Sequence, residues 1–334
     1  MRSSILVACL LASLSIAQEN TSQKPIFRSE SNVVIVPTLV KNDKGELVYG
    51  LQAKDFVIED DGIEQVAQLD EAADSQPISL VIAIQTGRRA TREFGRMRGL
   101  RSVLEPVLSN PRVESAVLFF DSHLDVALDF TNNSEAVTQR LQVLPPGDGG
   151  AAILDAVDFS VKLLSKRAEE RRRVLLLVSE TRDHGSHWAR RIEEVVAHVG
   201  NSNVVVYALA FSPSKSQVLD TLRGTNRDEA RATADLLAAV ALTANAMRRN
   251  IPKTVASMTG GEYGLFETRN GFETQMTAFD NHLYNRYFLS FQPKNPRPGL
   301  HQIRVRLREA GKGSVMARTN YWASGSSQES VTAK

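Results

Sequence analysis

One apolar run constrains the fold of this chain more than any other feature. Residues 80–84, Leu-Val-Ile-Ala-Ile, are continuously apolar and rich in β-branched side chains. This pattern is typical of a parallel strand that is buried on both faces. In open α/β sheets, ligands bind beyond the carboxyl ends of such strands. The polar segment that follows, residues 85–89, is therefore expected at the functional edge of a sheet.

A second buried strand is predicted at residues 174–178, which are all Val or Leu. Between and after the two strands, helical periodicity alternates with further β-rich runs. The predicted helices span residues 91–108, 134–144, 151–166, 186–199 and 270–287, and the predicted strands 116–120, 124–130, 204–210 and 264–266. This alternation predicts a doubly wound, mostly parallel α/β sheet, with an antiparallel hairpin at one edge.

Sequence with strand periodicity also flanks the α/β region on both sides. The N-terminal part, residues 32–76, contains two predicted hairpins, and the C-terminal part, residues 286–323, contains three predicted strands. Neither part is large enough to form a stable sheet domain alone. We therefore expect the two parts to combine in a small β-sandwich, with the α/β domain of residues 77–285 inserted between them.

The N-terminus has the pattern of a secretory signal peptide, predicted at residues 1–17. A basic residue precedes the apolar segment 5–14, which is too short to span a bilayer, and Ser-Ile-Ala ends the pattern. Residues 6–9 also fit a lipoprotein box that would lipidate Cys9, but almost no apolar sequence precedes this only cysteine. We expect an exported protein, periplasmic or extracellular, that is stabilised without disulfides.

The remaining termini are polar, and the overall charge is nearly balanced. Residues 18–31 form a polar leader and residues 324–334 a polar tail. Forty basic and 38 acidic residues give a net charge of +2, which provides no general attraction for nucleic acid or anionic membranes. No second apolar segment is long enough to cross a bilayer, so we expect no membrane span and no nucleic-acid partner.

The order of strand, polar loop, helix, Gly-Gly loop, helix, strand and acidic loop resembles a von Willebrand factor type A domain. Further segments resemble the leader and tail of bacterial secreted proteins that carry such a domain. They are residues 36–40, 43–45, 50–51, 55–56 and 59–62 near the N-terminus, and 259–261 and 321–323 near the C-terminus. The resemblance implies a Rossmann-like fold and a non-enzymatic protein that acts as an adhesion or scaffold module.

Domains of this type hold a divalent cation through an Asp-x-Ser-x-Ser loop, a Thr and a further Asp. Oxygen ligands of this kind suit a hard cation. The resemblance places these ligand positions on Gln85, Gly87 and Arg89, on Ala151 or Ala152, and on Glu180. Most of these side chains cannot act as the usual ligands, and arginine repels a cation. We therefore expect a degenerate metal site, with no metal or other cofactor.

Charged side chains are expected to surround the crevice at this edge of the sheet, and Arg92 is one of them. We predict that five of them contact a protein partner: Arg88, Arg89, Asp148, Glu180 and Asp183. The simpler interpretation is that they form solvated ion pairs, each worth about 0–1 kcal/mol. The alternative is that Arg88 or Arg89 fills the vacant metal position and donates two hydrogen bonds to a partner carboxylate.

Two other functions remain open. Cation-dependent adhesion could use a rebuilt site of Gln85, Thr86 and Glu180, and a hydrolase could use Asp183, His184 and His187. The sequence lacks a Gly-x-Ser-x-Gly elbow and a phosphate-binding loop, which favours the non-enzymatic interpretation. An Ala-rich insertion at residues 213–250 is expected to be helical and to cover the domain or contact the partner.

Overall fold

The computed structural model describes residues 33–72, 75–211, 236–294, 297–309, 311 and 313–324. All of them belong to one compact unit, Asn32–Lys334. Several predicted features lie outside the described residues: the signal peptide with Cys9, the polar leader, most of the polar tail and residues 213–235 of the insertion.

A six-stranded sheet forms the centre of the α/β domain, in the order β10-β9-β8-β5-β6-β7. Its strands are β5 (Ile78–Gln85), β6 (Val113–Phe120), β7 (Leu124–Thr131), β8 (Arg172–Ser179), β9 (Val204–Phe211) and β10 (Tyr263–Phe266). Neighbouring strands are parallel except β6 and β7, which pair antiparallel at one edge. All eight residues of β5 are buried, because both faces of the sheet are covered.

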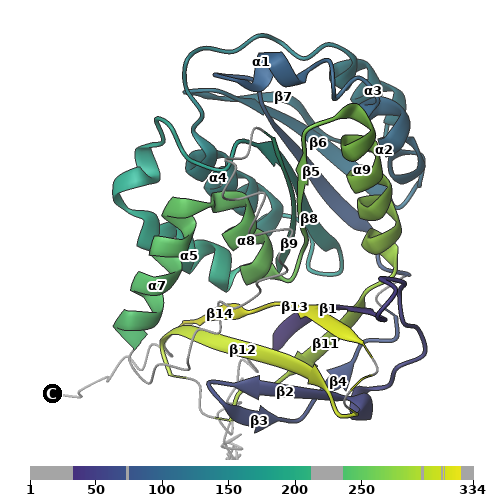
Figure 1. Cartoon of the computed structure of the whole chain (residues 1–334), viewed down its shortest axis with the longest axis vertical. Coiled ribbons are helices and arrows are strands. Elements are labelled where there is room, and N and C mark those ends of the chain that lie inside the picture. The colour runs from purple at the N-terminus through teal and green to yellow at the C-terminus, as the bar shows by residue number, and fades with distance from the viewer. Residues whose placement is uncertain are drawn as a thin grey trace, which may run out of the picture. The chain divides into compact units, whose positions relative to one another are not determined.

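Helices cover both faces of this sheet. They are α1 (Ala90–Glu93), α2 (Leu100–Leu108), α3 (Ser134–Gln142), α4 (Ile153–Ser165), α5 (Ile192–Asn201), α7 (Leu236–Arg249), α8 (Ile251–Thr259) and α9 (Arg269–Tyr284). Helices α4, α5, α7 and α8 pack on one face, and α2, α3 and α9 on the other (Figure 1). This arrangement confirms the predicted doubly wound fold class. No described helix is long and apolar enough to span a bilayer.

Two predicted helices are shorter in the structure. The helix expected at residues 91–108 is interrupted by turns between Glu93 and Leu100, where Gly95 and Gly99 disfavour helix. The helix expected at 186–199 begins only at Ile192. It follows a 3₁₀ turn, His187–Arg190, and the backbone N–H groups of His187 and Trp188 donate to the Asp155 carboxylate.

The two terminal parts of the chain combine in two four-stranded antiparallel sheets, ordered β13-β1-β11-β4 and β14-β12-β2-β3. The strands are β1 (Val34–Lys41), β2 (Phe56–Asp60), β3 (Ile63–Gln65), β4 (Gln68–Leu69), β11 (Tyr287–Phe291), β12 (Gly299–Leu307), β13 (Ser314–Ala317) and β14 (Asn320–Ala323). One apolar cluster joins both sheets, including Val36, Phe56 and Leu289. The sandwich thus draws strands from both ends of the chain, as predicted, while the domain boundaries stay predictions.

Arg318 links this sandwich to the α/β domain. Its guanidinium is buried and donates to the carbonyl oxygens of Ile35 (3.0 Å), Gly200 (2.6 Å), Ser202 (3.1 Å) and Asn320 (2.9 Å). Burial lowers the pKa of Arg318 to about 10, so the side chain still carries its charge at neutral pH. Because these carbonyls come from β1, β14 and the C-terminal end of α5, one side chain connects three elements.

Candidate functional site

Two buried polar side chains at the carboxyl edge of the sheet bond to each other. Gln85 ends β5 and Glu180 follows β8, and they are 0% and 7% exposed. The Gln85 Nε2 donates to Glu180 Oε1 (3.2 Å), and Gln85 Oε1 accepts from the Glu180 backbone N–H (2.8 Å). Nε2 also donates to the carbonyl of Gly87 (3.1 Å). Both polar atoms of the Gln85 side chain are therefore engaged within the protein.

Three loops meet beside this pair with their backbones in direct contact. A methyl group at Gly87 would lie 2.1 Å from the carbonyl oxygen of Gly150 and 2.7 Å from Cβ of Asp121. A methyl group at Gly147 would lie 2.7 Å from the backbone nitrogen of Gly87. No side chain fits at Gly87 unless the neighbouring loops move, so this position does not accommodate the serine that the resemblance implies.

The loop that carries the implied threonine position is also tied down through its backbone. The N–H of Ala151 donates to the His184 carbonyl (2.7 Å), and the His184 N–H donates back to Ala151 (2.8 Å). The N–H of Ala152 donates to the Asp121 carbonyl (2.7 Å). Both alanines are fully buried and present only methyl groups.

Arg88 and Arg89 lie on the loop after β5. Arg88 has a φ of 53°, an uncommon value for a residue other than glycine, and its N–H donates to the Asp148 carbonyl (2.7 Å). Its Nε lies 3.5 Å from Glu180 Oε1. The backbone N–H of Arg89 lies 3.4 Å from the same oxygen, whereas the Arg89 side chain is exposed, as is that of Arg92. Glu180 thus accepts a hydrogen bond from the Arg89 backbone and forms an ion pair with the Arg88 side chain.

Asp148 joins the Gly-rich loop to the β6–β7 loop. Its carboxylate accepts from the Ser122 hydroxyl (2.6 Å), the Ser122 N–H (3.1 Å) and the Gly150 N–H (2.7 Å). The hydrogen bond from the Ser122 hydroxyl contributes most to a lowered pKa of Asp148. The Asp148 N–H in turn donates to Asp121 (3.0 Å). Asp121 and Ser122 are site residues that the sequence analysis treated only as a hairpin turn.

Asp183 lies at the N-terminus of α4. Its carboxylate accepts from the Leu154 N–H (3.0 Å) and from the N–H (3.1 Å) and hydroxyl of Ser186. A carboxylate in this position satisfies a free helix N–H and interacts favourably with the helix dipole. Among the described residues, its contacts do not include the arginines that we expected beside it.

The three residues considered for a hydrolase have separate partners. His187 Nδ1 lies 2.8 Å from Asp155, and the His187 side chain is 89% exposed. His184 pairs with Ala151 through its backbone, and Asp183 contacts α4. In the described part of the chain, the acidic and His groups close enough to share a cation are Asp60, Asp61 and His301, and Asp121, His123 and Asp148. Neither group includes the three hydrolase candidates.

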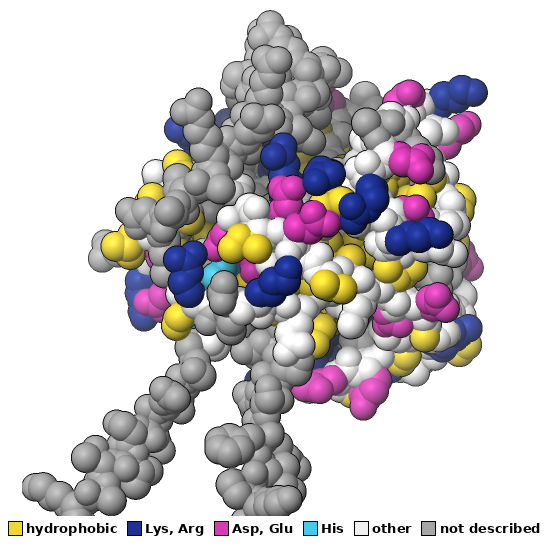
Figure 2. Space-filling model, turned by 90° about the horizontal axis from the view of Figure 1, so that it is seen from below, with side chains coloured by type: hydrophobic (Ala, Val, Ile, Leu, Met, Phe, Trp, Pro, Cys, Tyr) yellow, Lys and Arg dark blue, Asp and Glu magenta, His cyan; other side chains and the backbone are white. Residues whose placement is uncertain are grey.

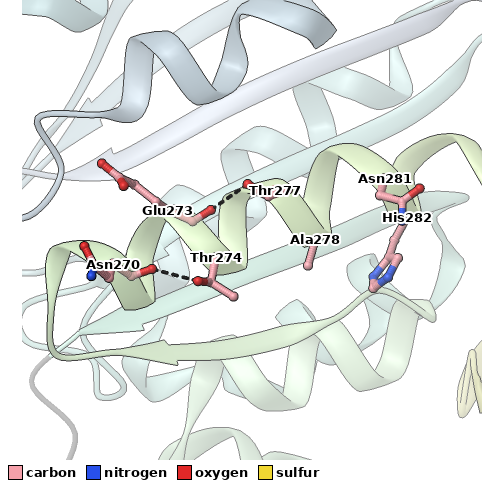
Figure 3. A pocket seen from close by; sticks show the side chains of 7 residues that line it. All are labelled: Asn270, Glu273, Thr274, Thr277, Ala278, Asn281 and His282. Carbon is pink, nitrogen blue, oxygen red and sulfur yellow. Dashed lines mark hydrogen bonds between the residues drawn. The ribbon is translucent and has the colours of Figure 1, made fainter. Parts of the chain in front are cut away.

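A hollow of about 640 Å³ runs along one side of α9 (Figure 3). Its lining consists of Asn270, Glu273, Thr274, Thr277, Ala278, Asn281 and His282. Both threonine hydroxyls donate to carbonyls of their own helix, those of Asn270 and Glu273 (Figure 3). His282 Nδ1 lies 2.5 Å from Glu262. The polar groups of this hollow are therefore largely engaged within the protein, and they form no catalytic grouping.

Charge is mixed on the face of the molecule that Figure 2 shows. Lys and Arg side chains lie between Asp and Glu side chains there, with hydrophobic side chains among them (Figure 2). This pattern agrees with the near balance of 40 basic and 38 acidic residues. A face of this kind does not provide the continuous positive field that nucleic acid prefers.

Fold and site together define a doubly wound α/β domain with a hydrogen-bonded polar cluster at the carboxyl edge of its sheet. The sequence model of the von Willebrand factor type A domain matches residues 97–241. The chain contains a von Willebrand factor type A domain, which confirms the predicted resemblance. The matched segment begins after β5 and the loop 85–89.

Several solved structures are similar to this chain. The conserved hypothetical protein BatB from Bacteroides thetaiotaomicron is 12% identical, with 61% of this chain and 99% of that chain covered and a TM-score of 0.38. Proximal thread matrix protein 1 from the mussel byssus is 9% identical, with 63% and 48% covered and a TM-score of 0.43. The vWF domain of the pilus tip protein Mfa5 from Porphyromonas gingivalis is 14% identical, with 32% and 39% covered and a TM-score of 0.28. No curated protein sequence matches.

Proposed function

We propose that this chain is an exported, non-enzymatic module that binds a protein partner through its type A domain, without a metal ion at the carboxyl edge of the sheet. The observation that carries the proposal is the pair of hydrogen bonds between Gln85 and Glu180. Export rests on the signal-peptide pattern of residues 1–17.

The side chains of Gln85 and Glu180 already have hydrogen-bond partners within the protein. The amide Nε2 of Gln85 donates to Glu180 and to the Gly87 carbonyl, and Arg88 Nε lies 3.5 Å from the same Glu180 carboxylate. The Arg88 guanidinium is positively charged and the Gln85 N–H has a partial positive charge, so both oppose a cation at this carboxylate. This arrangement also argues against the rebuilt site, since Thr86 directs its hydroxyl to the Phe120 carbonyl (3.3 Å).

The proposed partner presents carboxylates to this edge. Arg88 pairs with Glu180, whereas Arg89 and Arg92, which follow it in the chain, are exposed. Arginine binds carboxylates with two parallel hydrogen bonds, which adds geometric specificity to the charge attraction. The exposed carboxylate of Asp148 provides a nearby acceptor for basic groups of the same partner.

Thermal unfolding with Mg²⁺ and with chelator tests the metal-free proposal. We expect the same midpoint in both solutions. A cation at 100 times its dissociation constant would add about 2.7 kcal/mol to the free energy of unfolding, which is easily measured. A saturable Mg²⁺-dependent increase that disappears in Glu180→Ala would contradict the proposal and favour cation-dependent adhesion.

Charge reversal tests the proposed partner surface. We expect the protein to bind an immobilised Glu-rich peptide more strongly than a Lys-rich peptide of the same length. The double variant Arg89→Glu, Arg92→Glu should weaken binding at least about tenfold, since it replaces two attractive charges by repulsive ones. Arg98→Glu, an exposed change in the same segment, is the matched control. Equal loss in the control, or none in the double variant, would place binding elsewhere.

A further inference from the structure

A separate group of ionisable side chains lies in the β-sandwich, away from the edge described above. Asp60 ends β2, Asp61 follows in the β2–β3 turn, and His301 lies on β12. One potential ligand atom from each of these residues lies within 4.8 Å of the other two. Asp61 and His301 are 240 residues apart, so only the joining of the two chain ends assembles this group.

The His301 ring is held so that Nδ1 faces the two carboxylates. Its Nε2 lies 2.6 Å from the carbonyl oxygen of Arg297, which can only accept, so Nε2 carries a proton. The ring also stacks on Tyr321, with 4.8 Å between ring centroids and 19° between the planes. Metal-binding histidines are typically oriented in this way, by donating the N–H of their other nitrogen to a carbonyl or carboxylate.

Each carboxylate is held through one oxygen and turns the other toward His301. That oxygen of Asp61 also lies 3.5 Å from Nη2 of Arg297, whose side chain is 70% exposed and free to move away when a cation binds. Asp61 Oδ1 accepts from the Gln302 backbone N–H (3.0 Å), and Asp60 Oδ2 accepts from the Tyr321 hydroxyl (3.0 Å). The other oxygens face His301, with Nδ1 lying 2.9 Å from Asp61 Oδ2 and 3.6 Å from Asp60 Oδ1.

Asp60 Oδ1 provides an independent indication of a missing ligand. Asp60 is only 6% exposed, and this oxygen is buried without a hydrogen-bond donor in the described part of the chain. His301 Nδ1 lies 3.6 Å from this oxygen, which is beyond hydrogen-bonding distance, and a buried carboxylate oxygen without a hydrogen bond is costly. A cation within this group would satisfy it.

We propose that Asp60, Asp61 and His301 bind one divalent transition-metal ion, with zinc the best fit. Zinc accepts one imidazole nitrogen and two carboxylate oxygens at about 2.0–2.2 Å, which places tetrahedral ligands about 3.3 Å apart. The separations of 2.9 and 3.6 Å bracket that value. Mg²⁺ fits poorly, since it prefers six oxygen ligands. The ion would connect the β2–β3 turn to β12 and so join the two ends of the chain.

Calorimetric titration of the purified chain with Zn²⁺ tests the site. We expect binding that includes one strong site, together with a Zn²⁺-dependent increase in the unfolding temperature. Asp61→Asn should weaken this site at least tenfold and remove the temperature increase. The variant is expected to fold, since Asp61 has a φ of 48°, which asparagine adopts readily, and an amide oxygen can still accept from Gln302.

Two further variants decide the location of the ion. His301→Gln should also remove the strong site. His123→Asn disrupts the other acidic group, with Asp121 and Asp148, and should leave the site unchanged. Full Zn²⁺ affinity in both Asp61→Asn and His301→Gln, or its loss in His123→Asn alone, would overturn the assignment. The outcome is independent of the Mg²⁺ experiment at Glu180.

Discussion

At the scale of single residues, Gly87 decides how the carboxyl edge of the sheet is built. The carbonyl oxygen of Gly150 occupies the space where a side chain of residue 87 would begin. This close approach brings the loop after β5 against the Gly-rich loop and places Arg88 beside Glu180. Backbone packing between these loops therefore closes the edge at Gly87.

Replacement of Gly87 by alanine should destabilise the protein. The added methyl group would lie 2.1 Å from a backbone oxygen, so the loops must move, at a cost of about 1–3 kcal/mol. Urea unfolding measures the change. Gly149→Ala is the matched control, since a methyl group there meets nothing within 4 Å, and it should change stability by less than about 0.5 kcal/mol. Similar losses in both variants would contradict this account.

At the scale of elements, loops after the strands fix the N-terminus of α4. The backbone of Ala151 pairs with that of His184, and Asp183 accepts the N–H of Leu154 in the first turn of the helix. Asp155, also in this turn, accepts hydrogen bonds from two backbone N–H groups of the 3₁₀ turn His187–Arg190. Asp183 and His184, which were considered for a hydrolase, therefore hold the N-terminus of α4 in place.

Replacement of Asp183 by alanine should weaken this connection. The change removes the acceptor for Leu154 and the carboxylate near the helix N-terminus, and we expect a loss of about 0.5–2 kcal/mol in the free energy of unfolding. Urea unfolding at neutral pH tests it, with the exposed Glu169→Gln as the control. If stability is unchanged while binding of the Glu-rich peptide is altered, Asp183 belongs to the partner surface instead.

At the scale of the whole described unit, a partly buried ionic cluster around Glu262 forms a second link between the sandwich and the α/β domain. Glu262 lies between Lys41 of the sandwich (3.2 Å), His282 of α9 (2.5 Å) and Arg286 (3.3 Å). Burial alone would raise the pKa of Glu262, but the hydrogen bond to His282 and the charges of Arg286, His282 and Lys41 lower it to about 2. The ionised form thus stabilises the assembled structure.

The free energy of unfolding should fall as acid protonates Glu262. A carboxyl with a pKa of about 2 in the folded state and about 4.5 when unfolded contributes fully above pH 4.5 and loses its contribution as the pH falls toward 2. The shift corresponds to about 3 kcal/mol. Urea unfolding at several pH values should show a smaller loss over this range in Glu262→Gln than in wild type. An identical pH dependence in both proteins would contradict the prediction.

The sequence by itself determined the elements and their broad arrangement. Continuous apolar runs such as residues 80–84 indicate strands buried on both faces, and the pairing of two short β-rich ends follows from their inability to stand alone. The replacement of the usual ligand types at Gln85 and Arg89 follows from the resemblance alone and stays a prediction. The inferences about strands and fold class succeed because they depend on local periodicity.

Only the tertiary structure decided which polar atoms meet. Asp60 and His301 lie at opposite ends of the chain, and the close approach at Gly87 depends on how the Gly-rich loop crosses it. The α4 contact of Asp183 likewise appears only once β8 and α4 are adjacent. Hydrogen bonds and ligand groups depend on separations of a few tenths of an ångström between distant segments, and periodicity along the chain does not encode such distances.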